Sequence, residues 1–189
     1  MLDSGKSATR DKERTRNALI EAGIQLISER GTSVSLADVA TRAGVSKGAL
    51  THHFASRDAL VDAIVSDATQ RFWDEVHSNV DISENRAGKL LRGYIRTLAS
   101  ESVFMRQFFS PTFLMLVSGS EQSIQNILND DAEAWRVAFA SDGIDIATSL
   151  VLRLAAEGLA TSIDSPFLTA SELESVRDRL LAMAEPGAS

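Results

Sequence analysis

The sequence predicts an all-α protein, and three observations support this fold class. Apolar residues recur at intervals of three and four along almost the whole chain, which is the spacing of amphipathic helices. Only three of the 189 residues are proline, and no useful run alternates apolar and polar residues as a half-buried strand does. With 44% hydrophobic and 24% charged residues, the chain can bury a core larger than a short helical motif needs. We therefore expect a small domain over residues 1–58 and a larger helical domain over residues 59–189.

The first helix is expected over residues 11–30. Four apolar residues recur on one face of this segment: Leu19, Ala22, Leu26 and Ile27. Gly31 follows the last of them, and glycine readily takes the left-handed conformation in which many helices end.

The next helix begins near Leu36. Ser35 precedes an apolar run and Asp38 lies three residues later, so their side-chain oxygens can accept the unpaired N–H groups of a helix start. The inward face carries the small residue Ala40, which lets a second helix cross closely. Gly44 ends this helix with a tight exit turn.

A third helix over residues 47–54 is capped by Ser46 and turns Leu50 and Phe54 inward. Six donors or small residues face outward or along its rim: Ser46, Lys47, Gly48, Thr51, His52 and His53. A helix in the major groove contacts base edges near its N-terminus, while flanking donors hold phosphates. The two helices and their glycine turn are therefore interpreted as a helix-turn-helix.

The segment GVSKGALTHHFASRDALVDAI resembles the recognition-helix region of the tetracycline-repressor (TetR) family of bacterial transcription regulators. The resemblance covers roughly residues 14–65 and includes the Ala40 and Gly44 spacing, the His53-Phe54 pair and the start of a connecting helix at Ser56. It implies an N-terminal three-helix, homeodomain-like helix-turn-helix domain and a C-terminal helical bundle for ligand binding and dimerisation. Family members often carry a tyrosine where this chain has Thr51, whose hydroxyl and methyl lack a phenol's reach.

The DNA-contacting residues are predicted in two groups. Base or groove contacts are assigned to Ser46, Lys47, Gly48 and Thr51. Phosphate contacts are assigned to Ser35, His52, His53 and Arg57.

The net charge of −7 would by itself argue against nucleic-acid binding, but its distribution is uneven. Residues 1–58 hold nine Lys and Arg against seven Asp and Glu, a net charge of +2, and the remainder holds 10 against 19, a net charge of −9. A DNA-facing domain on an acidic body fits this asymmetry, with a dimer doubling the contacts. Lys12, Arg14 and Arg16 could alternatively be solvent-exposed charges without a role.

The rest of the chain is expected to be helical over residues 56–77, 83–100, 104–109, 121–141, 145–163 and 171–184, with a short run at 112–117. The last helix is predicted to begin at a capping box formed by Ser171 and Glu174. The last two helices carry broad apolar stripes that need close helical neighbours. In the family that the chain resembles, these helices pair between two subunits, which implies a homodimer and a two-fold operator. The expected interface residues are Leu150, Val151, Leu154, Gly158, Leu173, Val176 and Leu180, although both helices could simply cover their own core.

Aromatic and sulfur-containing residues concentrate in the middle of the larger domain. Five of the eight phenylalanines fall between residues 104 and 139. Ligand pockets in helical bundles are lined by such residues, and TetR-like proteins commonly bind a small effector here, although packing as core is the alternative. The expected lining residues are Phe104, Met105, Phe108, Phe109, Phe113, Trp135 and Phe139.

An enzyme is not expected, because the parts of a catalytic site are missing. Phosphate-binding glycine loops and nucleophile elbows are absent, and the adjacent His52 and His53 point about 100° apart on a helix and cannot chelate one metal. No cofactor or metal is expected. The chain has no cysteine, and no segment approaches the ~18 apolar residues of a membrane span, so a soluble, cytoplasmic protein is expected.

The sequence thus predicts a ligand-responsive transcriptional regulator, most often a repressor in the family it resembles. It would bind a palindromic double-stranded operator as a homodimer and be released by a small hydrophobic or amphipathic effector. The alternative is a helical adaptor that binds a protein partner through its apolar helices.

Overall fold

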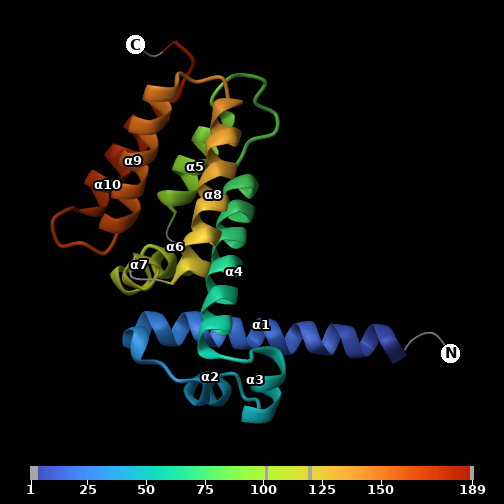
Figure 1. The fold of residues 1–189 in the computed structure, drawn as a ribbon. Coiled ribbons are helices and arrows are strands. Elements are labelled where there is room, and N and C mark those ends of the chain that lie inside the picture. The colour runs from blue at the N-terminus through green and yellow to red at the C-terminus, as the bar shows by residue number, and fades with distance from the viewer. Residues whose placement is uncertain (1–3, 101, 119–120, 188–189) are drawn as a thin grey trace. The chain divides into compact units, whose positions relative to one another are not determined.

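The computed structural model describes residues 4–100, 102–118 and 121–187 of the chain. These residues form ten α-helices and one short 3-10 helix, without a strand among them (Figure 1). The predicted all-α fold class is therefore confirmed.

The chain divides into two compact units. Unit 1 comprises Met1–Ala68 and Thr112–Gln125, and unit 2 comprises Thr69–Pro111 and Asn126–Ser189. The divisions fall inside α4 (Arg57–Ser78) and inside α8 (Gln122–Ala140), so both helices contribute residues to both units. The boundary expected after residue 58 would fall within the first turn of α4.

Unit 1 contains α1 (Ser4–Arg30), the 3-10 helix η1 (Gly31–Ser33), α2 (Leu36–Arg42) and α3 (Lys47–His53). It also contains the first turns of α4 and most of α7 (Pro111–Ser118). Its core is apolar and includes Leu19, Leu26, Val39, Leu50 and Ile64, each at most 2% exposed. The helices expected at 36 and 47 begin at those residues.

Helix α1 begins seven residues before the expected start at Asp11. From Thr9 to Ala18 its side chains are exposed apart from a half-buried Thr15, so packing does not determine where this end begins. The extra turns, residues 4–10, mix the strong helix formers Lys, Ala and Arg with Ser, Gly and Thr, so neither an apolar face nor uniformly high helix propensity marks this start in the sequence.

The turn between α2 and α3 depends on Gly44, whose φ is +68°. No atom lies within 4 Å of the position that a Cβ would take, so the glycine is needed for its backbone conformation rather than for space. The Val45 N–H donates to the Ala40 carbonyl at 3.0 Å, which closes the exit of α2.

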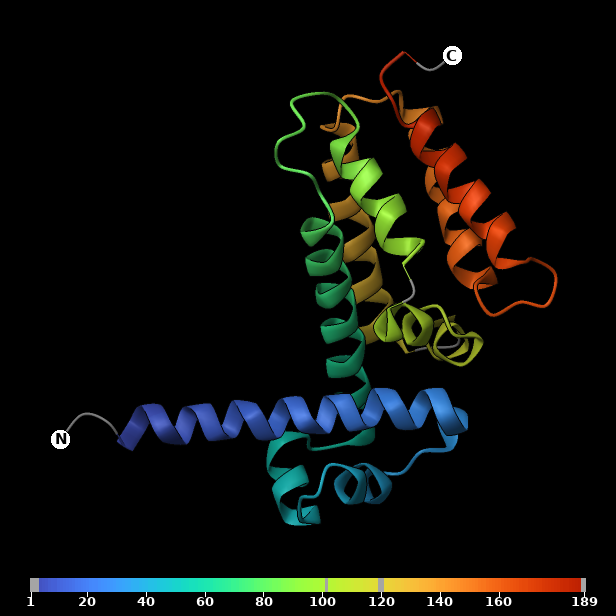
Figure 2. The ribbon, with the colours of Figure 1, turned by 180° about the vertical axis from the view of Figure 1, so that it is seen from behind.

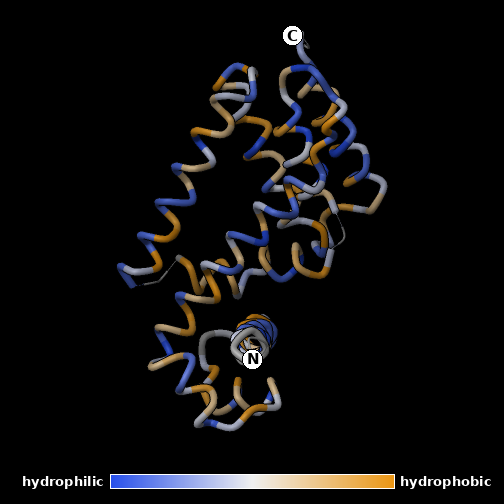
Figure 3. Tube along the Cα trace, turned by 90° about the vertical axis from the view of Figure 1, so that its right-hand side faces the viewer, coloured by the Kyte–Doolittle hydropathy of each residue, from blue (hydrophilic) through white to orange (hydrophobic). Residues whose placement is uncertain are grey.

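Unit 2 is built around α5 (Lys89–Leu98), α9 (Ile146–Ser162) and α10 (Ala170–Met183), which pack against one another. The short α6 (Val103–Phe108) contacts α9, and α9 and α10 lie side by side (Figure 2). Hydrophobic and hydrophilic segments alternate along the helices, as their amphipathic spacing predicts (Figure 3).

The expected start of the fifth helix at Ser83 is wrong, because α5 begins at Lys89. The Asp142 carboxylate accepts the Leu90 and Leu91 N–H groups at 3.0 and 2.9 Å, and this carboxylate lies about fifty residues away in the chain. Gly88 precedes the helix with a φ of +83°, and a Cβ there would lie 2.7 Å from the Ala184 carbonyl oxygen. The helix start is therefore set by tertiary contacts.

The predicted capping box of the last helix is also wrong in its position. Thr169, not Ser171, is the N-cap of α10, and its hydroxyl accepts the Glu172 N–H while the Glu172 carboxylate accepts the Thr169 N–H at 2.7 Å. Two overlapping pairs with the required spacing occur here, and the chain uses the earlier one.

A buried arginine holds one end of unit 2 together. Arg92 is 1% exposed, and its guanidinium donates to the Glu84 carboxylate at 2.7 Å and to the carbonyls of Ala87 and Ala184 at 2.9 and 2.7 Å. Because a buried cation is stable only when paired and hydrogen-bonded, this network joins the loop before α5 to the end of α10.

Candidate functional site

The exposed face of α3 carries the residues that the sequence predicts for DNA contact. Lys47, Gly48, Thr51 and His52 are exposed, and His53 is half-buried, while Leu50 on the opposite face is fully buried. The Leu50 face packs against unit 1, so the polar face is presented to solvent as a recognition helix requires.

The hydroxyls of Ser46 and Thr51 on this face form different hydrogen bonds. Ser46 is the N-cap of α3, and its Oγ accepts the Ala49 N–H at 3.1 Å, which leaves the hydroxyl proton available to donate. The Thr51 hydroxyl donates within the helix, to the carbonyls of Gly48 and Lys47 at 3.0 and 3.2 Å. Thr51 therefore offers an acceptor oxygen and a methyl group to a base edge.

Gly48 has no structural reason to be glycine. Its φ is not in the left-handed region, and an added Cβ would meet only the Ser46 Oγ at 3.8 Å, which is ordinary contact. Glycine inside a helix costs stability relative to alanine, and its usual benefit is close approach of the backbone to another molecule.

The two histidines lie in a locally positive environment. Their ring centroids are 5.8 Å apart, and partial burial lowers the pKa of His53 below its usual value of 6.5. The positive charges of His52, Lys12 and Arg16 lower this pKa further. The imidazole of His53 is thus neutral at pH 7 and can offer one N–H to a phosphate.

Ser35 and Arg57 are less available for phosphates than the sequence suggests. The Ser35 hydroxyl donates to the Asp38 carboxylate at 2.5 Å and accepts the Asp38 N–H at 3.2 Å, so this capping box uses both functions of the hydroxyl. Arg57 is half-buried and its Nε donates to the Val34 carbonyl at 3.3 Å, which ties the start of α4 to the segment before α2. Both residues therefore also have a role in folding, and their phosphate contacts stay predictions.

Sequence reasoning left Lys12 and Arg16 as charges that could be merely exposed. The structure places both close enough to His53 to affect its pKa, and the Arg16 guanidinium lies 5.6 Å from the centroid of the Phe54 ring. Spacing along α1 could not reveal that these residues lie beside α3. By contrast, Arg42 forms a two-bond ion pair with Glu29 at 3.0 and 2.7 Å, which compensates its charge.

The predicted pocket residues are mostly packed in the interior. Phe104, Met105, Phe113, Trp135 and Phe139 are each at most 6% exposed, and Phe108 and Phe109 are half-buried. Trp135 stacks on Trp73 with ring centroids 3.6 Å apart, and the ring of Phe108 stacks on Phe72 at 5.2 Å. Phe113 lies in unit 1 and the other six lie in unit 2. These contacts favour the alternative interpretation, in which the aromatic residues pack as core.

Two titratable groups lie in the aromatic core of unit 2, where Tyr94 is buried and Asp131 is half-buried. Burial raises the pKa of the Asp131 carboxyl, although the Trp73 indole donates to that carboxylate at 2.7 Å and opposes the rise. Burial also raises the pKa of Tyr94, whose hydroxyl donates to the Glu157 carboxylate at 2.8 Å. Both groups have hydrogen-bond partners within unit 2.

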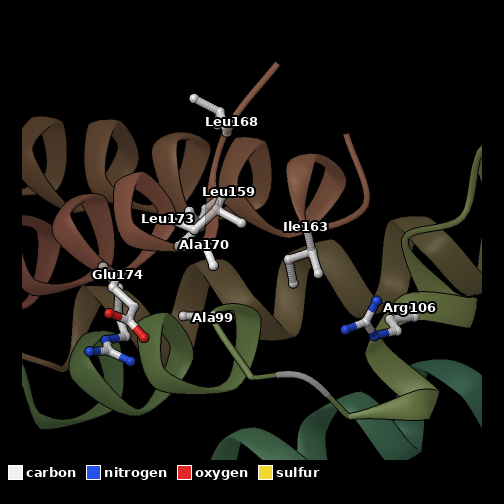
Figure 4. A pocket seen from close by; sticks show the side chains of 9 residues that line it. Ala99, Arg106, Leu159, Ile163, Leu168, Ala170, Leu173 and Glu174 are labelled. Carbon is white, nitrogen blue, oxygen red and sulfur yellow. The ribbon is translucent and has the colours of Figure 1, made fainter. Parts of the chain in front are cut away.

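A cavity of about 390 Å³ lies elsewhere in unit 2 (Figure 4). It is lined by Ala99, Arg106, Leu159, Ile163, Leu168, Ala170, Leu173, Glu174 and Arg177. None of the seven predicted pocket residues lines it. Its volume falls within the range of roughly 300–1,000 Å³ that is typical of small-molecule sites.

The predicted dimer residues separate into two groups. Leu150, Val151 and Leu154 are 49%, 60% and 64% exposed, and Gly158 and Val176 are also exposed. Ile146, which the sequence analysis did not select, is 66% exposed on the same face of α9. Leu180 is only 6% exposed and Leu173 lines the cavity, so these two differ from the exposed group, and the interface stays a prediction.

Among the described residues, no group of three or more His, Cys, Asp or Glu side chains could hold a metal ion. The same part of the chain contains no helix that is both long and apolar enough to cross a membrane.

Two family models match the chain. Residues 19–64 match the model of bacterial regulatory proteins of the tetR family, and residues 88–185 match a C-terminal domain like that of the tetracycline repressor. The second match alone covers more than half of the chain.

Two known proteins that are similar to this chain are also transcriptional regulators. The Escherichia coli transcriptional regulator BetI is 37% identical over 62 residues, and this match covers 32% of each chain, about a third of the length of the relative. A solved transcriptional regulator from Rhodococcus sp. Rha1 has a TM-score of 0.73 at 22% identity, covering 89% of this chain and 95% of its own.

The multidrug binding protein EbrR, solved with malachite green, has a TM-score of 0.64 at 22% identity, covering 89% of this chain and 96% of its own. At these identities the structural likeness concerns the fold, and the family assignment comes from the matched models. TetR-family regulators are generally non-enzymatic transcription factors. The chain belongs to the TetR family of DNA-binding transcriptional regulators.

Proposed function

We propose that this protein is a homodimeric repressor that binds a palindromic operator and is released by a small hydrophobic or amphipathic effector. The observation that carries the proposal is the exposed face of α3, where Ser46, Lys47 and Gly48 stand at the helix N-terminus. Residues at that end of a recognition helix contact base edges in the major groove.

The phosphate contacts are assigned to groups that surround this face. His52 and His53 lie at the end of α3, and the basic side chains of Lys12 and Arg16 approach them from α1. Because residues 59–189 carry a net charge of −9, the attraction to DNA depends on this local cluster rather than on the protein as a whole.

The homodimer is supported by the apolar face of α9. Ile146, Leu150, Val151 and Leu154 are all about half exposed or more, and they follow helical spacing, so they form one contiguous stripe. A second copy of the same helix would cover this stripe in an isologous interface. A two-fold protein then matches a two-fold operator.

Release by an effector would be a two-state equilibrium. A ligand that binds unit 2 more tightly in one conformation shifts the population towards it, and affinity for the operator falls by the same coupling factor. Since α4 contributes residues to both units, it is the continuous element through which we expect this coupling. EbrR is a multidrug binding protein, and a small-molecule effector for this chain is our proposal.

The experiment that tests the proposal selects bound DNA from a random duplex pool and measures the mass of the complex. The proposal expects an enriched palindrome bound by two chains or by a multiple of two, with affinity falling steeply in salt. An absence of enrichment at every salt concentration would contradict it and would favour a helical adaptor that uses the apolar face of α9.

A further inference from the structure

Thr51 is exposed on α3, and its hydroxyl proton already has acceptors within the helix. The hydroxyl donates to the carbonyls of Gly48 and Lys47 at 3.0 and 3.2 Å. The Thr51 oxygen is thus left to accept a hydrogen bond, and a phosphate, which only accepts, cannot supply one. Amino groups on the base edges of DNA are suitable donors. Thr51 therefore suits a base edge better than the DNA backbone.

The same hydrogen bonds orient the Thr51 side chain. A threonine in a helix bonds to the preceding turn from a restricted set of rotamers, so these bonds limit its χ1 angle. The oxygen and the methyl group consequently keep a constant position relative to α3. A base pair that fits both groups must present an amino donor and an apolar group together.

Of the two kinds of base pair, T·A presents both of these groups in the major groove. Thymine carries its C5 methyl group, and the paired adenine carries the N6 amino donor. A G·C pair presents the cytosine N4 amino donor and two guanine acceptors but has no methyl group. Thr51 can therefore distinguish T·A from G·C by two separate contacts.

Gly48 allows the short side chain of Thr51 to reach a base. It precedes Thr51 by three residues, which places the two residues on one side of the helix, and both are exposed. A Cβ at Gly48 would meet only the Ser46 Oγ at 3.8 Å, so packing within the protein does not require glycine. Because threonine ends at its γ atoms, α3 has to approach the base edges closely, and a residue without a side chain permits this.

We propose that Thr51 selects a T·A base pair, with its methyl group against the thymine methyl and its oxygen accepting the adenine N6 amino group, and that Gly48 permits the approach. The inference rests on the proposed function, because it names the base pair that the proposed recognition helix selects in each half-site. The operator should then carry T·A at the position of each half-site whose base preference depends on Thr51.

The test first identifies this position by selecting DNA from a random duplex pool with the unmodified protein and with Thr51→Ala. Two base analogues then each remove one contact. Uracil in place of thymine lacks the methyl group, and purine in place of adenine lacks the amino group. We expect each analogue, placed in both half-sites, to weaken binding of the unmodified protein about fivefold.

Two variants remove the same contacts from the protein. Thr51→Ser lacks the methyl group, so it should be insensitive to uracil and remain sensitive to purine. Thr51→Val lacks the oxygen and should show the reverse. Thr41→Val is the matched control, because Thr41 is exposed on α2 and its hydroxyl also donates within its helix, to the Ala37 carbonyl at 2.8 Å. This control should respond to both analogues as the unmodified protein does.

Gly48→Ala tests the second part of the proposal and should reduce the response to both analogues, because α3 would then lie farther from the bases. Full responses in Gly48→Ala would overturn the role of Gly48.

The outcomes separate this inference from the proposed function. A palindrome that is unaltered in Thr51→Ala, that carries G·C at the altered position, or to whose analogues Thr51→Ser and Thr51→Val respond equally refutes the base assignment alone. The expected responses on a site that is not palindromic, or that a single chain binds, refute the proposed homodimer alone. An absence of any enriched sequence refutes both.

Discussion

The helix-turn-helix and helix α5 of unit 2 differ in the distance along the chain over which their helix starts are stabilised. In the helix-turn-helix, Ser35, Ser46 and Ser56 each accept an N–H from a residue three positions later. In unit 2, α5 begins on the Asp142 carboxylate, and Arg92 donates to a carbonyl 92 residues away. The proposed DNA-reading element is therefore defined by local contacts, whereas the start of α5 and the end of α10 depend on long-range polar contacts.

The largest expected effect is the loss of stability on removal of the long-range contacts of Arg92. Arg92→Met removes the hydrogen bonds to Ala87 and Ala184 and leaves the Glu84 carboxylate with weaker compensation. We expect the free energy of unfolding to fall by about 3 kcal/mol, because the carbonyls of Ala87 and Ala184 lose their donor and the Glu84 carboxylate loses its most buried partner. Urea unfolding checks this value.

Arg136→Met is the control for this experiment, because the Arg136–Glu133 pair is exposed and one turn apart on α8. It should change stability by less than about 0.5 kcal/mol. Equal effects of the two variants would contradict the distinction between long-range and local contacts.

The next largest effect concerns the exposed stripe of α9. Leu154→Glu places a charge at the centre of the proposed interface, where the two-fold axis would bring two such charges together. We expect the dimer to dissociate and operator affinity to fall about a hundredfold, because each half-site is then bound separately. Light scattering and a titration of operator DNA measure both effects.

Ile82→Glu provides the comparison for Leu154→Glu. Ile82 is 91% exposed and lies outside helix α9, so the same charge should leave the mass and the affinity unchanged. A dimer that survives Leu154→Glu would exclude the α9 stripe as the interface.

Gly48→Ala separates folding from recognition within α3. The added methyl meets only ordinary contacts, so stability should rise by up to about 1 kcal/mol. Operator affinity should nevertheless fall about tenfold if the backbone approaches the DNA closely at this residue. Thermal unfolding and DNA titration of the same sample give both numbers, and unchanged affinity would remove Gly48 from the interface.

The smallest effect is the pH dependence due to His53. Burial and the charges of His52, Lys12 and Arg16 lower the pKa of His53 in the free protein, and a neighbouring phosphate would raise it. DNA binding then takes up protons, so affinity should increase a few-fold as the pH falls from 7.5 to 6. His53→Gln should flatten this dependence, and a profile that is identical in the two proteins would argue against the phosphate contact.

The same pKa shift has the opposite effect on the free protein. Because the pKa of His53 is lower in the folded than in the unfolded state, its contribution to stability is present above pH 6.5 and is lost as the pH falls. Unfolding measured without DNA separates the two effects.

The contrast between the regions also explains what could be predicted from sequence. The starts of α2 and α3 were predicted at the correct residue because their serine caps lie next to them. The start of α5 was missed by six residues because no local signal indicates Asp142 as its cap. Exposed apolar residues at Leu150 and Leu154 were recognised from their spacing.

The cavity could not be found from the sequence for a similar reason. Aromatic content indicated the region of Trp135, but stacking against Trp73 fills that space. The cavity instead lies among leucines and alanines whose composition is ordinary, and only the packing of α5, α6, α9 and α10 brings them together. Lys12 and Arg16 are a comparable case, since their proximity to His53 depends on how α1 packs.

The central claim is that the N-terminal end of α3 contacts DNA, and the salt dependence of operator binding by Lys47→Ala tests it most directly. Lys47 is exposed at the first residue of the helix. If it contacts DNA in both subunits, the slope of log affinity against log salt should decrease in magnitude by nearly two, about 0.9 for each lost contact. A slope and an affinity equal to those of the unmodified protein would contradict the claim.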